Sequence, residues 1–250
     1  MDLTTFRRLL TPPGQAVLQA AAALQPTEAD FLPLFTRLQK QYPTELARAA
    51  LGIAINRLKA VGKFPFAEKL YFTREALEQA SSFEISSYRA QRYQSFDRVS
   101  DLGCSVGADT LALASAARGS LTGIDLDELR LHMAQANLAA LNLADRVHFV
   151  CADLVSPLPY SEGPNFALFF DPARREQDRR LFSVRQYHLP WILLRTGWQG
   201  SPPKPACPLF ARLHRNKGQT VECARSCSPD ERHKNRPAAQ AGTPLLWRFA

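Results

Sequence analysis

Long hydrophobic runs are missing from this chain of 250 residues, although 46% of its residues are hydrophobic. No run reaches the roughly 18 apolar residues of a membrane-spanning helix, so we expect no membrane partner. The opening MDLTTFRRLLTPPG lacks an apolar core followed by a small-residue cleavage site, so we expect no secretory signal. Cysteine is also scarce, and its odd count of five suits a reducing cytoplasm better than a disulfide scaffold. These absences predict a globular cytoplasmic protein with an ordinary hydrophobic core.

Most of the chain has no excess of positive residues over negative ones, although the net charge of the whole chain is +8. Residues 1–190 contain 21 Lys and Arg against 20 Asp and Glu, whereas residues 191–250 contain 10 against 3. The total charge therefore does not indicate a nucleic-acid-binding protein. An RNA partner has to be argued from particular residues.

Residues 1–95 are predicted to be helical. Thr11 precedes two prolines and an apolar segment, which is typical of a helix start. Thr27 and Asp30 form a capping-box-like pair before FLPLFTRLQ, and Thr73 caps REALEQA. The segment ELARAALGIAINRLKAV has apolar residues near helical spacing, which predicts a buried stripe. This stripe consists of Leu46, Ala50, Ile53, Leu58 and Val61.

Residues 96–190 alternate between strands and helices. Short strands are expected at 98–103, 121–125, 147–153 and 166–171, with helices after the first two. This alternation is typical of βαβ units, and the apolar run FALFF suits a strand buried on both faces. We predict an α/β fold with a Rossmann-like, open, mostly parallel sheet, recognisable in four strands and preceded by the helical region.

Residues 191–250 show no secondary-structure period and hold seven of the 18 prolines and three of the five cysteines. Disorder accounts for part of this composition, but Trp, Cys and Phe are not typical of solvated tails. A shifted reading frame in the source DNA would also produce it. The potential zinc ligands here form no C-x-x-C pair, so we predict no metal site. They are Cys207, Cys223, Cys227 and His233.

The motif DLGCSVG joins the first predicted strand to its helix. Gly103 permits a tight turn, and Gly107 permits close approach of the backbone to a ligand. Open parallel sheets bind ligands beyond the carboxyl ends of their strands, and an acid after the second strand can hold ribose hydroxyls. One strand-end aspartate is often only a cap, but four in succession indicate a site. These four are Asp101, Asp125, Asp153 and Asp171.

At these residues the chain resembles class I S-adenosylmethionine-dependent methyltransferases. Their acid-x-Gly-x-Gly-x-Gly motif is matched at Asp101, Gly103 and Gly107, with Ser105 in place of the middle glycine. The resemblance implies S-adenosyl-L-methionine as the cofactor, with its amino-acid part in this loop. It also implies two contacts further along the chain. These are Asp125 at the ribose and Asp153 beside the adenine amino group.

The segments LLTPPGQAVL, FTREALEQA, DLGCSVGADTLALA and FFDPARR resemble a bacterial methyltransferase group with a helical N-terminal region and a THUMP-like C-terminal domain. The likeness covers roughly residues 5–188. That group continues with a fifth strand, a closing strand pair and the C-terminal domain, none of which is recognisable here. The cofactor-binding domain at 96–190 is therefore expected to be partial, and the tail to be frameshifted or disordered.

The fourth strand ends in Asp171-Pro172-Ala173-Arg174, which matches the first two positions of the Asn/Asp-Pro-Pro-aromatic motif of amine-methylating members. The resemblance implies in-line methyl transfer, for which the protein chiefly aligns donor and acceptor. The carboxylate of Asp171 and the carbonyl of Pro172 would hold the hydrogens of an amine. Likeness to THUMP-bearing and guanosine-methylating enzymes favours an RNA base as that amine.

Basic residues follow this motif, among them Arg174 and Arg175, which could contact RNA phosphates. A solvated face balanced by Glu176 and Asp178 is the alternative interpretation. The same two interpretations apply to basic residues of the helical region. These are Lys59, Lys63, Lys69, Arg89 and Arg92.

Other classes stay open. The sequence GCSVG also reads as a hydrolase elbow with Ser105 as nucleophile, followed by Asp171 and His188. An elbow normally follows earlier strands, however, and here only helices precede it. A nicotinamide site lacks its G-x-G-x-x-G pattern. A truncated or non-catalytic cofactor-binding or RNA-binding module is a third alternative, and Cys104 is expected to be a packing residue. The oligomeric state is not indicated.

Overall fold

The computed structural model describes residues 1–154, 165–171, 175–176 and 179–180. Pro172 and Arg174 lie outside these residues. The tail at 191–250 also lies outside them, and so do His188 and the cysteines and histidine that were considered as zinc ligands. The alternatives of disorder and a shifted reading frame concern this tail.

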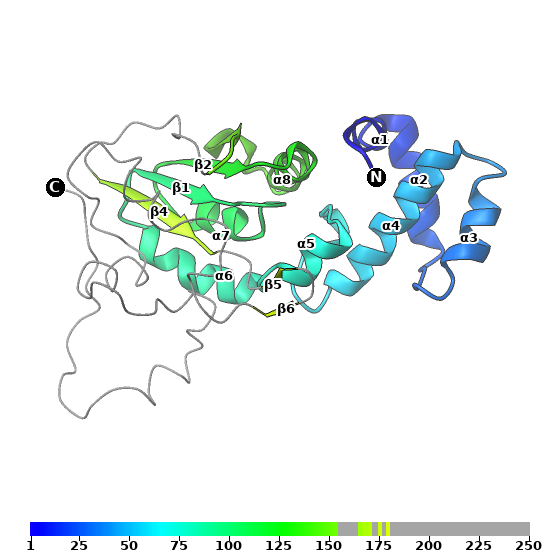
Figure 1. Ribbon diagram of the computed structural model, residues 1–250, viewed down its shortest axis with the longest axis horizontal. Helices are drawn as coiled ribbons and strands as arrows, with labels where there is room; N and C mark the ends of the chain where they lie inside the picture. Colours follow the sequence, from blue (N-terminus) through cyan, green and yellow to red (C-terminus); the bar gives the residue numbers. More distant parts are fainter. Residues whose placement is uncertain (155–164, 172–174, 177–178, 181–250) are drawn as a thin grey trace, which may run out of the picture.

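A four-stranded sheet forms the centre of the described part of the chain, with the strand order β3-β2-β1-β4 and parallel pairing throughout (Figure 1). This confirms the predicted open parallel sheet. In such a sheet every strand delivers its carboxyl end to the same edge. The strands are β1 (Arg98–Leu102), β2 (Ser120–Asp125), β3 (Val147–Cys151) and β4 (Phe166–Phe170).

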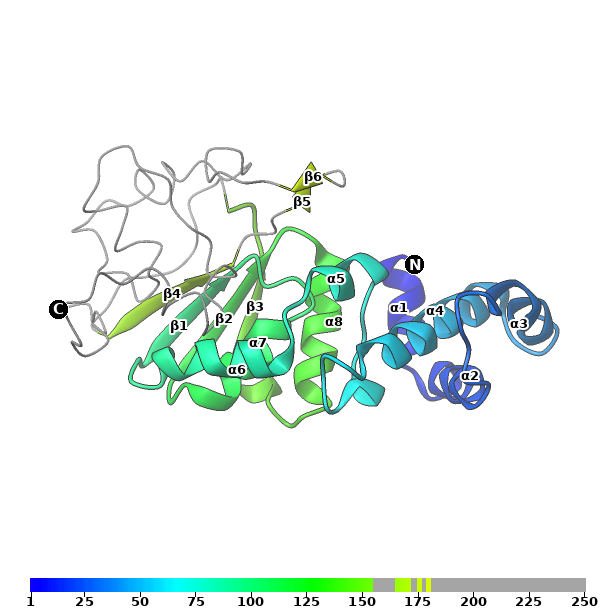
Figure 2. The ribbon, with the colours of Figure 1, turned by 90° about the horizontal axis from the view of Figure 1, so that it is seen from below.

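Two helices connect the first three strands and pack together on one face of the sheet (Figure 2). They are α7 (Ala108–Ala116), between β1 and β2, and α8 (Glu128–Ala139), between β2 and β3. The alternation of strand and helix thus produced the expected crossovers, which place the loops after β1 and β2 side by side. Strand β4 is buried along its whole length, as its apolar run predicts.

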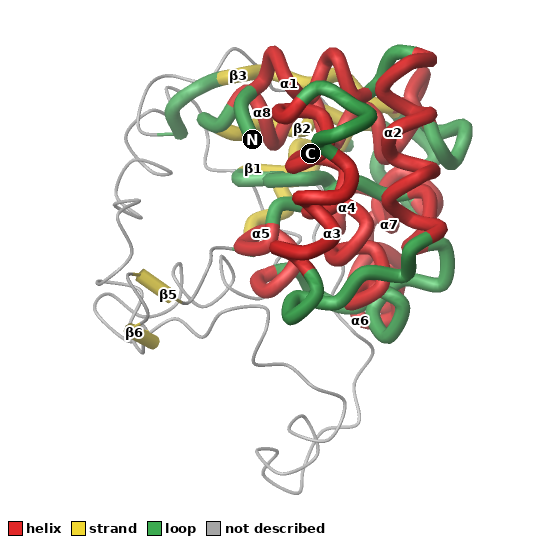
Figure 3. Tube along the Cα trace, turned by 90° about the vertical axis from the view of Figure 1, so that its right-hand side faces the viewer, coloured by secondary structure: helices red, strands yellow, loops and turns green. Residues whose placement is uncertain are grey.

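Most of the helical region lies beyond the carboxyl ends of the strands, towards which the arrows point in Figure 1, and it stands in front of the sheet in Figure 3. Its last helix instead packs against α7. The region therefore stands mainly on the ligand side of the sheet. Its helices are α1 (Leu3–Leu9), α2 (Pro12–Ala23), α3 (Phe31–Leu38), α4 (Thr44–Ala60), α5 (Arg74–Gln79) and α6 (Phe83–Ala90). Short 3₁₀ helices are η1 (Ala67–Lys69), η2 (Gln91–Tyr93) and η3 (Ala144–Arg146), and a separate antiparallel pair is formed by β5 (Arg175–Glu176) and β6 (Arg179–Arg180).

Two of the three N-terminal caps that the sequence predicts are present in the structure. The side chains of Thr11 and Thr73 accept hydrogen bonds from the N–H groups of Gly14 and Ala76. Thr27 and Asp30 do pair, because both the N–H and the hydroxyl of Thr27 donate to the Asp30 carboxylate. The helix α3 begins only at Phe31, however, and Asp30, its N-cap residue, makes no side-chain cap.

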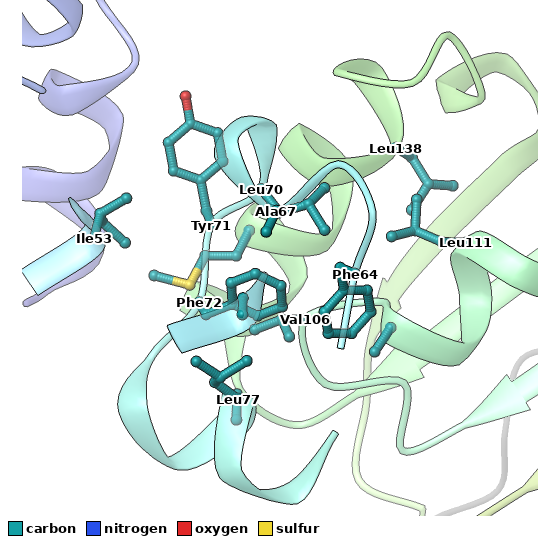
Figure 4. Close-up of a cluster of buried hydrophobic side chains, with 14 of the residues drawn as sticks. Ile53, Phe64, Ala67, Leu70, Tyr71, Phe72, Leu77, Val106, Leu111 and Leu138 are labelled. Atoms are coloured by element: carbon teal, nitrogen blue, oxygen red, sulfur yellow. The ribbon is translucent and has the colours of Figure 1, made fainter. Parts of the chain in front are cut away.

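One hydrophobic core runs through the helical region and the sheet (Figure 4). Phe64 and Phe72, from the segment after α4, lie with Val106 of the loop after β1 and with Leu111 of α7. The helical region is consequently packed on the loop itself. Its position relative to the site is fixed by buried apolar surface.

Candidate functional site

The loop after β1 uses left-handed backbone conformations at three of its residues. Gly103 has a φ of +76°, Ser105 of +51° and Gly107 of +80°. The N–H groups of Gly103 and Cys104 both donate to the Ile124 carbonyl, at 2.8 and 3.0 Å, which fixes the loop against β2. Glycine takes this conformation without strain, but Ser105 holds it at a cost of about 1–2 kcal/mol. The loop is therefore a tight turn with a strained serine at its centre.

Asp125, the last residue of β2, organises the edge of the site. Its Oδ2 accepts the backbone N–H of Ser105 at 2.8 Å, and its Oδ1 accepts that of Asp127 at 2.9 Å. Asp127 in turn caps α8 by accepting the N–H of Arg130. One carboxylate thus joins the loop after β1 to the start of α8. This is the position at which the sequence predicts a ribose-binding acid.

Asp101 lies beneath the loop. It is 2% exposed, and its Oδ2 accepts a 2.6 Å hydrogen bond from the Thr110 hydroxyl of α7. Burial raises the pKa of Asp101 to about 8, and the charges of Asp109, Asp125 and Asp171 add to this, while the Thr110 hydroxyl opposes it. Asp101 therefore carries a proton at neutral pH and supports the loop from inside the fold.

Gly107 is the N-cap residue of α7 and lies against α8. A Cβ at this position would be 3.0 Å from the Cβ of Ala134. Nearby, the buried Asn137 of α8 binds Tyr71 at both its N–H and its carbonyl, at 2.7 and 3.0 Å, and donates to the Val106 carbonyl at 2.9 Å. This side chain links the helical region to the loop.

The remaining strand ends differ in exposure. Asp153 is exposed and lies two residues after the end of β3, which ends at Cys151 rather than continuing to residue 153 as predicted. Leu126 follows Asp125 and is 68% exposed, so an apolar side chain open to solvent stands next to this carboxylate in the chain. The two neighbouring strands β2 and β3 are thus each followed or ended by a carboxylate, Asp125 and Asp153. Leu126 adds an exposed apolar side chain next to the first of them.

Asp171 follows β4, where Phe170 pairs with Leu102, so it leaves the sheet beside Gly103. Its side chain is 2% exposed, and its Oδ2 accepts a 2.6 Å bond from Nη1 of Arg89 in α6. Arg89 also lies 3.1 Å from Oδ1 of Asp109. The fourth strand-end acid is thus anchored by the helical region.

This contact corrects the prediction for Arg89, which was expected on the surface. Its side chain is only 7% exposed, because the acids that bind it are themselves buried. Lys59 pairs with Glu28 at 2.5 Å, and Lys63 donates to the carbonyls of Leu77 and Ala80. All three cations thus have partners within the protein.

The hydrolase alternative finds little support in the loop. The hydroxyl oxygen of Ser105 is buried and has no hydrogen-bond partner in the described part of the chain, where a nucleophile would need a base. Cys104 is 6% exposed, and burial raises the pKa of its thiol well above the ordinary value, as expected for a packing residue.

Two features are absent from the described part of the chain. No described helix is both long and apolar enough to span a membrane. No three His, Cys, Asp or Glu side chains of that part of the chain come together as a metal site.

An adenosine-containing cofactor fits these residues. The buried Ser105 hydroxyl is an unused polar group in the loop, and a Cβ on Gly103 would meet only a Leu154 carbon at 3.9 Å, so the loop has open space beside it. Asp125 and the exposed Leu126 supply a carboxylate for hydroxyl groups and an apolar surface for a base.

Sequence reasoning missed the contributions of Asn137, Arg89 and Leu126. The sequence contains a hint of the role of Asn137, because this polar residue stands among the buried apolar positions of its helix. Leu126 carried a weaker one, as an apolar residue next to a predicted ribose acid. Nothing local pointed to Arg89, whose partner Asp171 is 82 residues away along the chain.

Two segments of the chain match known family models. Residues 99–172 match a methyltransferase domain, and residues 2–60 match a domain of unknown function, DUF8688. An uncharacterised S-adenosylmethionine-dependent methyltransferase of Mycobacterium tuberculosis, present in two strains, is 37% identical over 122 residues. The matched segment is 46% of this chain and 30% of the relative, so the chain spans less than a third of that protein's length.

Solved structures show smaller likenesses. A proposed rRNA methylase from Clostridium thermocellum is 28% identical, with 35% of this chain and 48% of that chain covered and a TM-score of 0.31. A proposed S-adenosyl-L-methionine-dependent methyltransferase from Methanococcus maripaludis is 22% identical, with 45% and 47% covered and a TM-score of 0.35.

Proposed function

We propose that this chain, which carries a class I S-adenosylmethionine-dependent methyltransferase domain behind a helical DUF8688 region, transfers a methyl group from S-adenosyl-L-methionine to an amine of an RNA base. One observation carries the proposal. The loop after β1 is built around left-handed residues and is bonded through the Ser105 N–H to Asp125, at the ligand edge of a parallel sheet.

In this proposal the loop from Gly103 to Gly107 holds the amino-acid part of the cofactor. Asp125 accepts the ribose hydroxyls, Leu126 packs on the base, and Asp153 lies beside the base amino group. When bound, the cofactor supplies an activated methyl on its sulfonium. The chain contributes alignment of the two reactants, which is worth several kcal/mol of the barrier.

The acceptor would approach beside Asp171 and Pro172. Asp171 leaves the sheet next to Gly103, so a group held there lies on the amino-acid side of the proposed cofactor site. A carboxylate can accept the N–H groups of an amine and direct its lone pair towards the methyl. Pro172 has no N–H that would compete for the same acceptor.

The arginines after Pro172 support an anionic acceptor. Arg175 lies in the short strand β5, which pairs with β6 directly after the acceptor motif in the chain. Arginine is a residue type that commonly binds nucleic-acid phosphates. Arg175 is therefore proposed, with Arg174, to contact the RNA backbone.

A transfer assay tests this proposal. The full chain is incubated with tritium-labelled S-adenosyl-L-methionine and total bacterial RNA, and the label is counted with and without ribonuclease. Label in RNA that ribonuclease releases supports the proposal. Label in added protein and none in RNA would contradict the RNA acceptor, and absence of cofactor binding would contradict the transferase itself.

A non-catalytic cofactor-binding module is the second candidate function. The motif at Asp171 departs from the Asn/Asp-Pro-Pro-aromatic pattern at its last two positions, Ala173 and Arg174, which is the observation in its favour. Such a module would bind the cofactor and transfer no label to any acceptor.

A further inference from the structure

A buried cluster of one cation and two carboxylates joins α6, α7 and the end of β4. The Arg89 guanidinium places Nη1 at 2.6 Å from Oδ2 of Asp171 and Nη2 at 3.1 Å from Oδ1 of Asp109. The side chains of Arg89, Asp109 and Asp171 are 7%, 16% and 2% exposed. Removing one partner from a buried ion pair leaves an uncompensated buried charge, so these three side chains depend on one another.

We propose that Arg89 is the positioning residue of the acceptor side of the site, holding the Asp171 carboxylate in one orientation beside the cofactor loop. The inference rests on the proposed function, because it assumes that Asp171 faces the transferred group. It assigns a role in that reaction to the helical region, which lies outside the matched methyltransferase segment at 99–172.

Arg89 is itself held from several sides. Ser86, one turn earlier in α6, donates a 2.7 Å hydrogen bond to the same Oδ1 of Asp109 that Arg89 approaches. The Phe169 ring of β4 lies 5.8 Å from the guanidinium carbon of Arg89. The guanidinium is planar and offers two separate nitrogens to two carboxylates, which a lysine ammonium cannot do in the same way. The arrangement thus requires arginine.

The charges around Asp171 show why a cation is needed. Asp101 and Asp109 lie near enough to influence one another electrostatically, and Asp171 acts on Asp101 in the same sense. Arg89 is a cation paired with both Asp171 and Asp109 in this group of acids. Without it, the buried carboxylates would repel one another and the Asp171 side chain would turn away. It would then no longer present a fixed acceptor to an amine.

The experiment needs no knowledge of the acceptor. Sinefungin carries an ammonium group where S-adenosylmethionine carries its methyl-bearing sulfonium, whereas S-adenosylhomocysteine has an uncharged sulfur there. A carboxylate that faces the transferred group should therefore strengthen the binding of sinefungin relative to that of S-adenosylhomocysteine. The ratio of the two dissociation constants, measured by calorimetry on the full chain, measures this preference. It is measured for the wild type, Asp171→Asn, Arg89→Met and the double variant.

We expect Asp171→Asn to reduce the preference for sinefungin by about tenfold in the wild-type background, as for the loss of a charge-assisted hydrogen bond. In the Arg89→Met background the same substitution should change the ratio less than twofold, because Asp171 is no longer held. Arg89→Lys, which keeps the charge but loses the fork, should give an intermediate effect. It also provides the test if the methionine variant does not fold.

Arg92→Met is the matched control, since Arg92 stacks over the Tyr88 ring at 5.9 Å and lies three residues beyond Arg89. In that background Asp171→Asn should retain its tenfold effect. An equal effect of Asp171→Asn with and without Arg89 would overturn the positioning role, and so would no effect in the wild type. Failure of the wild type to bind S-adenosylhomocysteine would instead overturn the proposed function.

Discussion

The backbone N–H of Ser105 donates a 2.8 Å hydrogen bond to Oδ2 of Asp125, so the loop after β1 and the end of β2 form one unit. Ser105 has a φ of +51°, and this bond helps to hold its strained backbone in place. A ligand that contacts Asp125 is therefore also in reach of the loop.

Asp125→Asn should weaken the binding of S-adenosylhomocysteine by at least about tenfold. The amide retains one oxygen but loses the charge that strengthens hydrogen bonds to N–H and hydroxyl groups. Calorimetry measures the effect. Asp145→Asn is the control, because Asp145 is exposed within η3, and its affinity should match the wild type. Equal affinities of the two variants would show that Asp125 takes no part in binding.

Asp101→Asn should remove a pH dependence of stability. The pKa of Asp101 is raised from 3.8 to about 8, so the folded state keeps a proton that the unfolded chain has lost. This contribution is fully present below about pH 4 and is lost as the pH rises to about 8. The free energy of unfolding of the wild type should therefore fall relative to the variant across that window.

Urea denaturation at several pH values between 4 and 9 measures this difference. Asparagine resembles the protonated acid and can still accept the Thr110 hydroxyl, so the variant should fold. A constant difference in unfolding free energy at every pH would contradict a protonated Asp101.

Gly107→Ala should lower the free energy of unfolding by about 1–3 kcal/mol. The left-handed backbone costs an alanine about 1–2 kcal/mol, and its Cβ would lie 3.0 Å from that of Ala134. Gly52→Ala is the matched control, because Gly52 lies inside α4 and nothing lies within 4 Å of its added Cβ. That variant should gain up to about 1 kcal/mol. Equal changes in both would refute the geometry of the loop.

Asn137→Ala should cost about 2–4 kcal/mol of unfolding free energy. The substitution leaves buried backbone groups of Tyr71 and Val106 without their partner. Chemical denaturation compares it with Gln135→Ala on the exposed side of α8, which should change stability by less than about 0.5 kcal/mol. A small effect of Asn137→Ala would show that the loop and the helical region are held by apolar packing alone.

The sheet was predictable because each strand is a short apolar run between turn residues. Every predicted strand exists, and the bounds differ by at most two residues, the largest difference being at β3, which ends at Cys151. The residues of the loop and Asp125 were predictable because they adjoin these strands. Thr11 and Thr73 were predictable as caps because a cap acts within three residues.

Features that depend on distant partners were not predictable. Leu58 and Val61 were expected in the core of α4, but they are 46% and 64% exposed, since the apolar neighbours of the helix lie on another side. Arg89 is buried because the fold brings it to Asp171. The local periodicity of the sequence predicts neither the exposure of Leu58 and Val61 nor the burial of Arg89.

Calorimetric titration of the full chain with S-adenosylhomocysteine tests the central claim most directly. The account predicts saturable binding of one molecule per chain, and a weaker isotherm for Asp125→Asn. A wild-type chain that unfolds cooperatively on heating and yet gives no binding isotherm would contradict it.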